Sequence, residues 1–241
     1  MRAGSISLRY DGAAVKRSVA RHLCGVLCFA WAGCSYAYDD SPFSPGGSTL
    51  LELGHYQTDF QYPSGSKLAH VGRYGLGFYQ PVSGAVDFDL HGGYATLDVD
   101  SDPVASLQDF TGRYLGLGAR YASSEGDHLN FSAEGSYTWY DLTGSSFVQQ
   151  SEIIWYESWL AAGPVLSSGP WRLAGGAYYQ NFQGNETDNG PPTSQYRTFS
   201  AGRQAGGYLG FDYYVDRTGS VGIYATAGAR HGVNIVFKRE F

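Results

Sequence analysis

Alternation of apolar and polar residues is the clearest signal in this chain. In residues 128–141, HLNFSAEGSYTWYD, every second side chain from Leu129 to Trp139 is apolar or small, and those between are polar. Residues 85–96 and 204–213 have the same two-residue period. This is the period of a β-strand whose two faces meet different surroundings. These stretches therefore predict strands with one face in apolar surroundings and the other in polar surroundings.

Ten segments of this kind follow a short stretch rich in Pro, Gly and Ser. They span residues 48–60, 69–80, 84–97, 110–121, 128–141, 152–166, 171–183, 199–214, 220–228 and 233–241. Two of them, 48–60 and 152–166, do not show clearly which face is apolar, and the last pair is short. Ten strands is therefore the prediction, and eight is the alternative.

The connections between the segments alternate in length. Longer ones lie at 61–68, 98–109, 142–151 and 184–198, and shorter ones at 81–83, 122–127, 167–170 and 215–219, with a short exception near 229–232. Short turns on one rim and long loops on the other are typical of transmembrane barrels. Because a bilayer offers no partners to backbone amides, only a closed sheet can cross it. We predict an all-β fold, a transmembrane antiparallel up-and-down β-barrel of about ten strands. The alternative is a secreted β-sandwich.

Aromatic residues gather near the segment ends, as in the two interfacial girdles of a membrane barrel. Near the short turns lie Phe78, Tyr79, Tyr121, Trp171, Tyr213 and Phe241, and towards the long loops lie Phe60, Trp139, Tyr140, Trp155, Tyr156 and Tyr179. We predict that both groups face the membrane surface. The alternative is that they cap an ordinary core.

Residues 1–37 have the layout of a cleavable signal peptide. Five basic residues precede the apolar stretch LCGVLCFAWAGC and the small-residue site Ser35-Tyr36-Ala37. We therefore divide the chain into a signal peptide, 1–37, and a barrel, 38–241. An N-terminal spanning helix is an alternative for which the apolar stretch is short, and lipidation at Cys34 is another.

Composition narrows the class of protein further. All three cysteines lie within residues 1–37, so the remainder has neither disulfides nor cysteine metal sites. Residues 38–241 hold 11 basic and 21 acidic residues, a formal net charge of −10. This charge argues against nucleic acid as a partner, because phosphates need cationic side chains.

The last eight residues, NIVFKREF, form a strand that ends on an aromatic residue. Ile235, Phe237 and Phe241 share one face, and this ending resembles the C-terminal assembly signal of bacterial outer-membrane β-barrel proteins. Arg239 and Val236 depart from the usual pattern, which has an apolar residue and often Gly at these positions. With the ten segments, the resemblance covers residues 38–241.

The resemblance implies a place and partners. It implies export to the bacterial outer membrane, surrounding outer-membrane lipid, the barrel-assembly machinery as a partner during biogenesis, and short turns facing the periplasm. It does not imply one function, because small barrels of this class include anchors, adhesins, channels and lipid-modifying enzymes.

The polar faces of the segments predict a charged lumen. Its expected members are Arg73, Asp87, Asp89, His91, Arg120, Glu134, Arg172, Asp212, Lys238 and Glu240, joined by Glu157. The interior of a barrel of about eight strands is nearly filled by side chains, and unpaired charges are costly there. We predict a salt-bridged network that largely fills the lumen, and a narrow polar pore is the alternative.

Candidate chemistry is sparse. Asp87, Asp89 and His91 could supply a general base, but they begin at the periplasmic end of their strand, far from surface substrates. We therefore expect no catalytic residues and no cofactor. A non-enzymatic structural or surface-interaction role for a monomer is the prediction. A passive channel and a lipid-modifying enzyme are the alternatives.

One loop has the spacing of a calcium site. In DVDSDPVASLQD, residues 98–109, Asp98, Asp100, Asp102 and Asp109 occupy positions 1, 3, 5 and 12. Pro103 stands where that motif has Gly, so an acidic solvated loop is the other interpretation. This loop and residues 184–198 are the expected contacts for an extracellular ligand.

Overall fold

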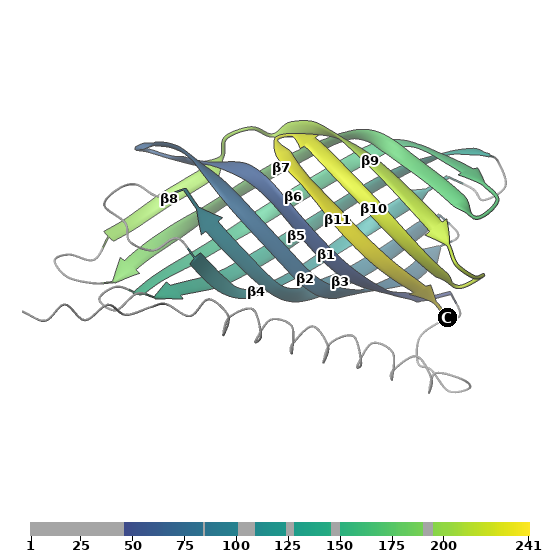
Figure 1. Ribbon diagram of the computed structural model, residues 1–241, viewed down its shortest axis with the longest axis horizontal. Coiled ribbons are helices and arrows are strands. Elements are labelled where there is room, and N and C mark those ends of the chain that lie inside the picture. Colours follow the sequence, from purple (N-terminus) through teal and green to yellow (C-terminus); the bar gives the residue numbers. More distant parts are fainter. Residues whose placement is uncertain (1–45, 84, 101–108, 124–127, 146–149, 190–194) are drawn as a thin grey trace, which may run out of the picture. The chain divides into compact units, whose positions relative to one another are not determined.

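A computed structural model describes residues 46–83, 85–100, 109–123, 128–145, 150–189 and 195–241, so the predicted signal peptide lies outside the described residues. One sheet closes on itself as a tilted barrel (Figure 1). Its strands are β1 (Ser48–Tyr62), β2 (Gly65–Ser83), β3 (Val86–Val99), β4 (Asp109–Ala122), β5 (Leu129–Ser145), β6 (Gln150–Ser168), β7 (Trp171–Asn189), β8 (Gln195–Ala201), β9 (Ala205–Tyr214), β10 (Gly219–Gly228) and β11 (Arg230–Glu240). Among the described residues, no helix has the length and apolar character needed to cross a membrane.

Ten of these strands form the closed ring. Each of β1 to β7 is antiparallel to the next, β9 to β11 continue the series from β7, and β11 pairs with β1 over the range Ser48 to Thr58. The prediction of an antiparallel up-and-down barrel of about ten strands is confirmed. We call the end where β1 begins and β11 finishes the proximal end, and the opposite end the distal end.

The segment predicted as one strand, 199–214, is divided in the structure. β8 pairs with the distal part of β7 and, through Phe60 and Gln61, with β1, whereas β9 pairs with the proximal part of β7. The division arises because the β10–β11 hairpin turns back at Gly228, whose φ is 106°, before it reaches the distal end. β8 therefore completes the wall on the distal side of the hairpin, between β7 and β1. The barrel narrows from ten strands to eight towards the distal end.

Three predicted long loops are wrong. Residues 61–68 contain a two-residue connection at 63–64. Residues 142–151 are strand at both ends, because β5 continues to Ser145 and β6 begins at Gln150. Residues 184–198 consist mostly of strand, because β7 continues to Asn189 and β8 begins at Gln195. Polar side chains did not stop these strands, because the ladder is held by backbone hydrogen bonds, and the buried carboxylates of Glu186 and Asp188 are paired with Arg197. The contrast in loop length between the two ends is correspondingly weaker than predicted.

The proximal turn between β9 and β10 is fixed by one carboxylate. Asp216 accepts hydrogen bonds from the backbone nitrogens of Thr218 at 2.8 Å and Gly219 at 2.7 Å. These donors stabilise the charged form and hold the pKa of Asp216 below its ordinary value.

A band of exposed apolar side chains surrounds the proximal part of the barrel. Leu90, Leu117, Leu209 and Ile235 belong to it, with Trp171 and Phe241 at its proximal edge. The longest strands, β6 and β7, have 19 residues each. At about 3.3 Å per residue and a tilt of about 40° such a strand rises roughly 48 Å, against roughly 25 Å for the apolar band of a membrane barrel. The distal part of the wall therefore extends beyond any bilayer that the band could cross.

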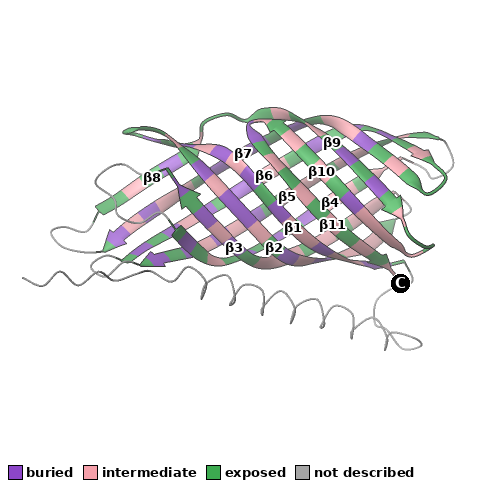
Figure 2. Cartoon of the chain, viewed as in Figure 1, coloured by how far each residue is buried: buried purple, intermediate pink, exposed green. Residues whose placement is uncertain are grey.

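The apolar face changes sides along the strands. Figure 2 shows how buried and exposed residues alternate along each strand. In β3, Phe88 and Leu90 point outwards, but Leu97 and Val99 point inwards while Asp98 faces out. The change follows from the surroundings, because beyond the hydrocarbon the outer surface meets water and only the interior is dry.

Four of the aromatic residues predicted for the two girdles face inwards instead. Tyr79 of the proximal group lines the lumen, where the Arg120 guanidinium lies over its ring. Phe60, Tyr140 and Trp155 of the distal group are buried inside the barrel. These three belong to an aromatic core that fills the distal half. Its buried members are Tyr56, Phe60, Tyr62, Ala69, Val71, Ala95, Leu97, Val99, Phe110, Tyr114, Tyr140, Leu142, Ile153, Trp155, Phe182 and Phe199. The ring of Trp155 stacks on Tyr140 at 4.1 Å between centroids, and Phe60 stacks on Phe199 at 4.5 Å. The predicted polar filling of the lumen is therefore wrong for this half, where apolar rings close the interior.

Candidate functional site

The proximal half of the lumen is polar and contains a cavity of about 270 Å³. Of the predicted lumen residues, those on the cavity wall are Arg73, Asp89, His91, Arg120, Glu134, Arg172, Asp212 and Lys238. The other two predicted members bind their neighbours: Asp87 pairs with Arg120 at 2.7 Å, and Glu240 with Lys238 at 2.8 Å. The alternating segments thus place all ten side chains on the inner face.

Arg73 is held by a carboxylate that the sequence did not single out. Its Nη2 lies 3.0 Å from Oε2 of Glu52, whose other oxygen accepts a hydrogen bond from Asn234 at 3.0 Å. The guanidinium also lies over the ring of Tyr114, 4.7 Å from its centroid. Glu52 was missed because residues 48–60 change their apolar face from outside to inside, which conceals the alternation.

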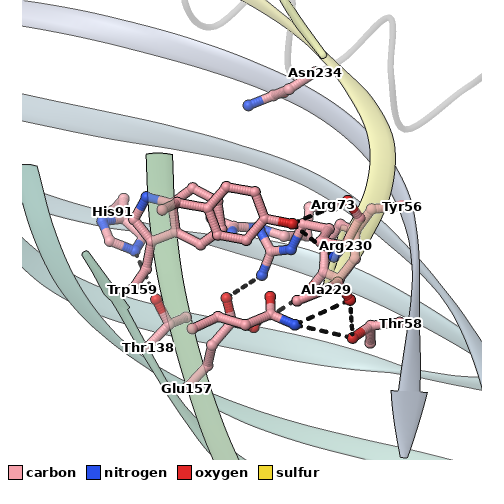
Figure 3. Close-up of polar contacts among 12 residues, drawn as sticks. Tyr56, Thr58, Arg73, His91, Thr138, Glu157, Trp159, Ala229, Arg230 and Asn234 are labelled. Atoms are coloured by element: carbon pink, nitrogen blue, oxygen red, sulfur yellow. Dashed lines mark hydrogen bonds and ion pairs between the residues drawn. The ribbon is translucent and has the colours of Figure 1, made fainter. Parts of the chain in front are cut away.

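A second buried ion pair lies where the cavity meets the aromatic core (Figure 3). Arg230 forms a salt bridge with Glu157, and Glu157 also accepts a hydrogen bond from the hydroxyl of Tyr56 at 3.3 Å. The guanidinium lies 3.8 Å from the centroid of the Tyr56 ring and 4.7 Å from that of Trp159. This cluster forms the boundary between the polar proximal lumen and the aromatic core of the distal half. Arg230 was missed because it falls in a predicted turn.

The tip of the β10–β11 hairpin is tied to the inside of the wall beside this pair. The carbonyl of Ala229 accepts hydrogen bonds from the Thr58 hydroxyl at 3.0 Å and from Gln180 Nε2 at 3.3 Å. Gln180 also donates to the Thr58 oxygen at 3.0 Å. The end of the short hairpin is therefore closed by buried polar groups at the place where the wall changes from ten strands to eight.

A carboxylate, an imidazole and a hydroxyl form a chain along the inner wall, from β3 over β4 to β5. Asp89 Oδ1 lies 2.5 Å from His91 Nδ1, and His91 Nε2 lies 3.0 Å from the Thr138 hydroxyl. Groups in this order can transfer a proton. Thr138 is only 3% exposed and its side chain does not line the cavity. The chain therefore orients the imidazole, and it leaves little surface on which a substrate could meet the hydroxyl.

Gly116 makes room for this chain, which gives a testable expectation. A Cβ at Gly116 would lie 2.2 Å from His91 Nε2 and 2.7 Å from the Thr138 oxygen. We expect Gly116→Ala to displace His91 and to lower the free energy of unfolding by about 1–3 kcal/mol, measured by urea unfolding in detergent. Gly207→Ala is the matched control, because its Cβ would meet no atom closer than 3.5 Å. Equal stability of the two variants would show that His91 is not confined.

A smaller polar cluster lies at the distal end. Arg197 on β8 forms salt bridges with Glu186, at 3.2 Å, and with Asp188, both on β7. Ser151 donates a hydrogen bond to Asp188. The sequence did not identify this cluster, because residues 184–198 were interpreted as a loop rather than as two paired strands.

The acidic calcium-like segment is only partly within the described residues. Asp98 and Asp109 lie opposite each other at the distal ends of β3 and β4 and face outwards, and Asp100 follows β3. Asp102 lies outside the described residues. Within the described part of the chain, no three His, Cys, Asp or Glu side chains are close enough to hold a metal ion. Calcium binding here stays a prediction.

The C-terminal residues lie where the ring closes. Ile235, Phe237 and Phe241 are exposed on the outer face, and the backbone of Phe241 bonds to Gly46 and Gly47 at 3.1 and 2.9 Å. The last strand thus supplies both the closing ladder with β1 and part of the apolar band.

Comparison with known proteins supports the architecture alone. No protein-family model and no curated protein matches the sequence. Among solved structures, the translocator domain of the autotransporter NalP from Neisseria meningitidis aligns with a TM-score of 0.50 and 10% identity, over 94% of this chain and 98% of that one. The Escherichia coli outer membrane protease OmpT aligns at 0.48 and 9% identity, over 84% and 99% of the two chains. The Yersinia pestis protein Ail aligns at 0.38 and 12%, over 82% and 99%.

These matches are too distant in sequence to transfer an activity. The closed ring, its apolar outer band and its polar proximal lumen show that this chain has the fold of the small bacterial outer-membrane β-barrels.

Proposed function

We propose that this protein is a sealed, non-enzymatic barrel of the bacterial outer membrane, with its distal end outside the cell and a structural or surface-interaction role. The observation that carries the proposal is the aromatic core, which occupies the distal half of the lumen where a channel would need an opening. The apolar band and the outer-membrane barrel fold support the location.

The energetics of the interior favour a seal. A hydrated ion that entered from the proximal cavity would meet the Arg230–Glu157 pair and then buried rings such as Trp155 and Phe60. Transfer of a charge into such surroundings without new partners costs many kcal/mol. Passage would require the core to unpack.

The wall beyond the bilayer supports the surface role. The distal parts of β6, β7 and β8 are paired with one another and braced by Arg197. They present a polar face in which Tyr196 is the most exposed of the large hydrophobic side chains. A surface made of paired strands loses less conformational entropy on binding than a loop that must become ordered. The acidic residues Asp98 and Asp109 lie at the same end.

Single-cysteine labelling tests the seal, because residues 38–241 contain no cysteine. Ser136→Cys places a thiol on the cavity wall, and Ser200→Cys places one on the exposed face of β8. In intact cells a membrane-impermeant maleimide should label Ser200→Cys and leave Ser136→Cys unlabelled, whereas both should react in purified protein. Rapid labelling of Ser136→Cys from outside would contradict the seal.

A narrow channel is the second candidate, and the proximal cavity is the observation that favours it. Planar-bilayer recordings of the purified protein separate the two. The sealed barrel should give no steps above baseline while a porin in the same bilayer conducts. Reproducible steps that vanish with heat-unfolded protein would favour the channel.

A further inference from the structure

Three of the five histidines in residues 38–241 lie together on the outside of the barrel. They are His55 on β1, His70 on β2 and His231 on β11. Gln57 lies between two of them, opposite His231 on one side and opposite His70 on the other. These side chains lie on the outward face of their strands, and both His55 and His231 are exposed.

The three rings lie at the distal edge of the apolar band. On β1 the outward residues Leu51 and Leu53 are followed by His55, and on β11 Val233 lies next to His231 along the same face. Elsewhere on the barrel, the same edge carries aromatic residues such as Tyr94, Tyr156 and Tyr179. Imidazoles therefore replace the expected girdle on one side of the barrel. Anchoring in a bilayer does not explain that replacement.

The spacing of two of these rings suits a shared metal ion. The ring centroids of His55 and His70 are 6.3 Å apart, with an interplanar angle of 31°. An imidazole nitrogen lies about 2.0–2.1 Å from a bound divalent ion, which puts each ring centroid about 3.2 Å from it and the two centroids about 5–6.5 Å apart. The observed separation lies at the upper end of that range, so the two rings can reach one ion between them.

The neighbouring amide can orient one ring for this task. Gln57 Nε2 and His70 Nδ1 are 3.3 Å apart. A metal-binding histidine uses one nitrogen and holds the other N–H on an acceptor. The two ends of a glutamine amide are interchangeable by a flip. With its oxygen turned to Nδ1, Gln57 would leave Nε2 of His70 free for the ion.

We propose that His55 and His70 bind a divalent transition-metal ion such as Zn²⁺ or Cu²⁺ at the outer rim of the barrel, with water completing its coordination. Imidazole nitrogens select these ions over Ca²⁺ and Mg²⁺, which prefer oxygen ligands. Asp98, opposite His70 on β3, and Asp109 beside it add negative charge that favours a cation at this place. The described residues contain no group of three His, Cys, Asp or Glu side chains that could hold a metal ion. The proposed site therefore has two protein ligands.

Metal titration of the purified, detergent-solubilised protein tests the site. Wild type should bind one equivalent of Cu²⁺, and Zn²⁺ should compete for it while Mg²⁺ and Ca²⁺ should not. His55→Ala and His70→Ala should each weaken binding by about tenfold or more, since each removes one of two ligands. His128→Ala, an exposed histidine between β4 and β5, and His231→Ala are the controls and should change affinity by less than about twofold. Heat-modifiable migration confirms that each variant is folded.

The spectrum of bound Cu²⁺ reports the number of nitrogen ligands directly, and a general loss of structure in a variant would not change it in this way. Electron paramagnetic resonance should show couplings from two imidazole nitrogens in wild type and from one in His70→Ala. The proposal is overturned if wild type binds no Cu²⁺, if the two variants bind as wild type does, or if His231→Ala loses as much affinity as His70→Ala. The labelling test of the sealed lumen involves none of these residues, so the two proposals can fail independently.

Discussion

Replacing Trp155 with Ala is expected to lower the free energy of unfolding by about 3–5 kcal/mol, the usual cost of removing a large buried aromatic side chain. Trp155 is 1% exposed and stacks on Tyr140, and it makes an edge-on contact with Phe60 at 6.0 Å between ring centroids. The other rings of the aromatic core belong to five different strands, β1, β4, β5, β7 and β8, and cannot collapse into the space without shifting the wall. Urea unfolding in detergent micelles, followed by far-ultraviolet circular dichroism, measures the loss.

Tyr196→Ala is the control for that experiment. Tyr196 lies at the same end of the barrel but is 67% exposed, so its removal should change stability by less than about 0.5 kcal/mol. A similarly small effect of Trp155→Ala would mean that the distal interior is loosely filled. The aromatic seal, and with it the proposed closed lumen, would then lose its physical basis.

Breaking the Arg230–Glu157 pair from one side should be equally damaging. Glu157→Ala leaves the guanidinium of Arg230 without its carboxylate in a buried place, and such a loss typically costs about 3–5 kcal/mol. The double variant Glu157→Leu with Arg230→Met removes both charges and should recover most of that stability, because no unpaired charge remains. The same unfolding experiment compares both variants with wild type.

The Arg113–Asp141 pair is the matched control. Its atoms are 3.1 Å apart, but the arginine side chain is 73% exposed, so Asp141→Ala should cost less than about 1 kcal/mol. If Glu157→Ala behaved like Asp141→Ala, Arg230 would have to be solvated in the native protein. That result would extend the water-filled lumen to the edge of the aromatic core.

Much of the proximal half could be predicted from the alternation alone. In β5, the outward series from Leu129 to Trp139 and the inward Glu134 agree with the structure, as do inward Asp87 and Asp212 on other strands. Polar side chains on the outer face of a membrane-crossing strand are unfavourable in hydrocarbon, whereas the inner face accepts them. Apolar and polar residues therefore alternate strictly along such a strand. Any such strand can be assigned its faces without knowledge of its neighbours.

The distal half was predicted less well, although the sequence contains a signal for it. Adjacent aromatic pairs mark the level where the apolar face changes sides: Trp139-Tyr140, Trp155-Tyr156 and Tyr178-Tyr179. In each pair one ring faces outwards and the other is buried inside. Taking both members as girdle residues placed Tyr140 and Trp155 on the wrong face.

The sequence by itself determined the closed all-β class, most of the strands and the faces of the regularly alternating ones in the apolar band, because these depend on a local period and on the solvent that each face meets. Only the tertiary structure decided which distant residues are neighbours. It brought Glu157 to Arg230, His55 to His70, and β8 into the gap above a short hairpin. These contacts depend on register and closure around the whole ring, and no local pattern specifies either one.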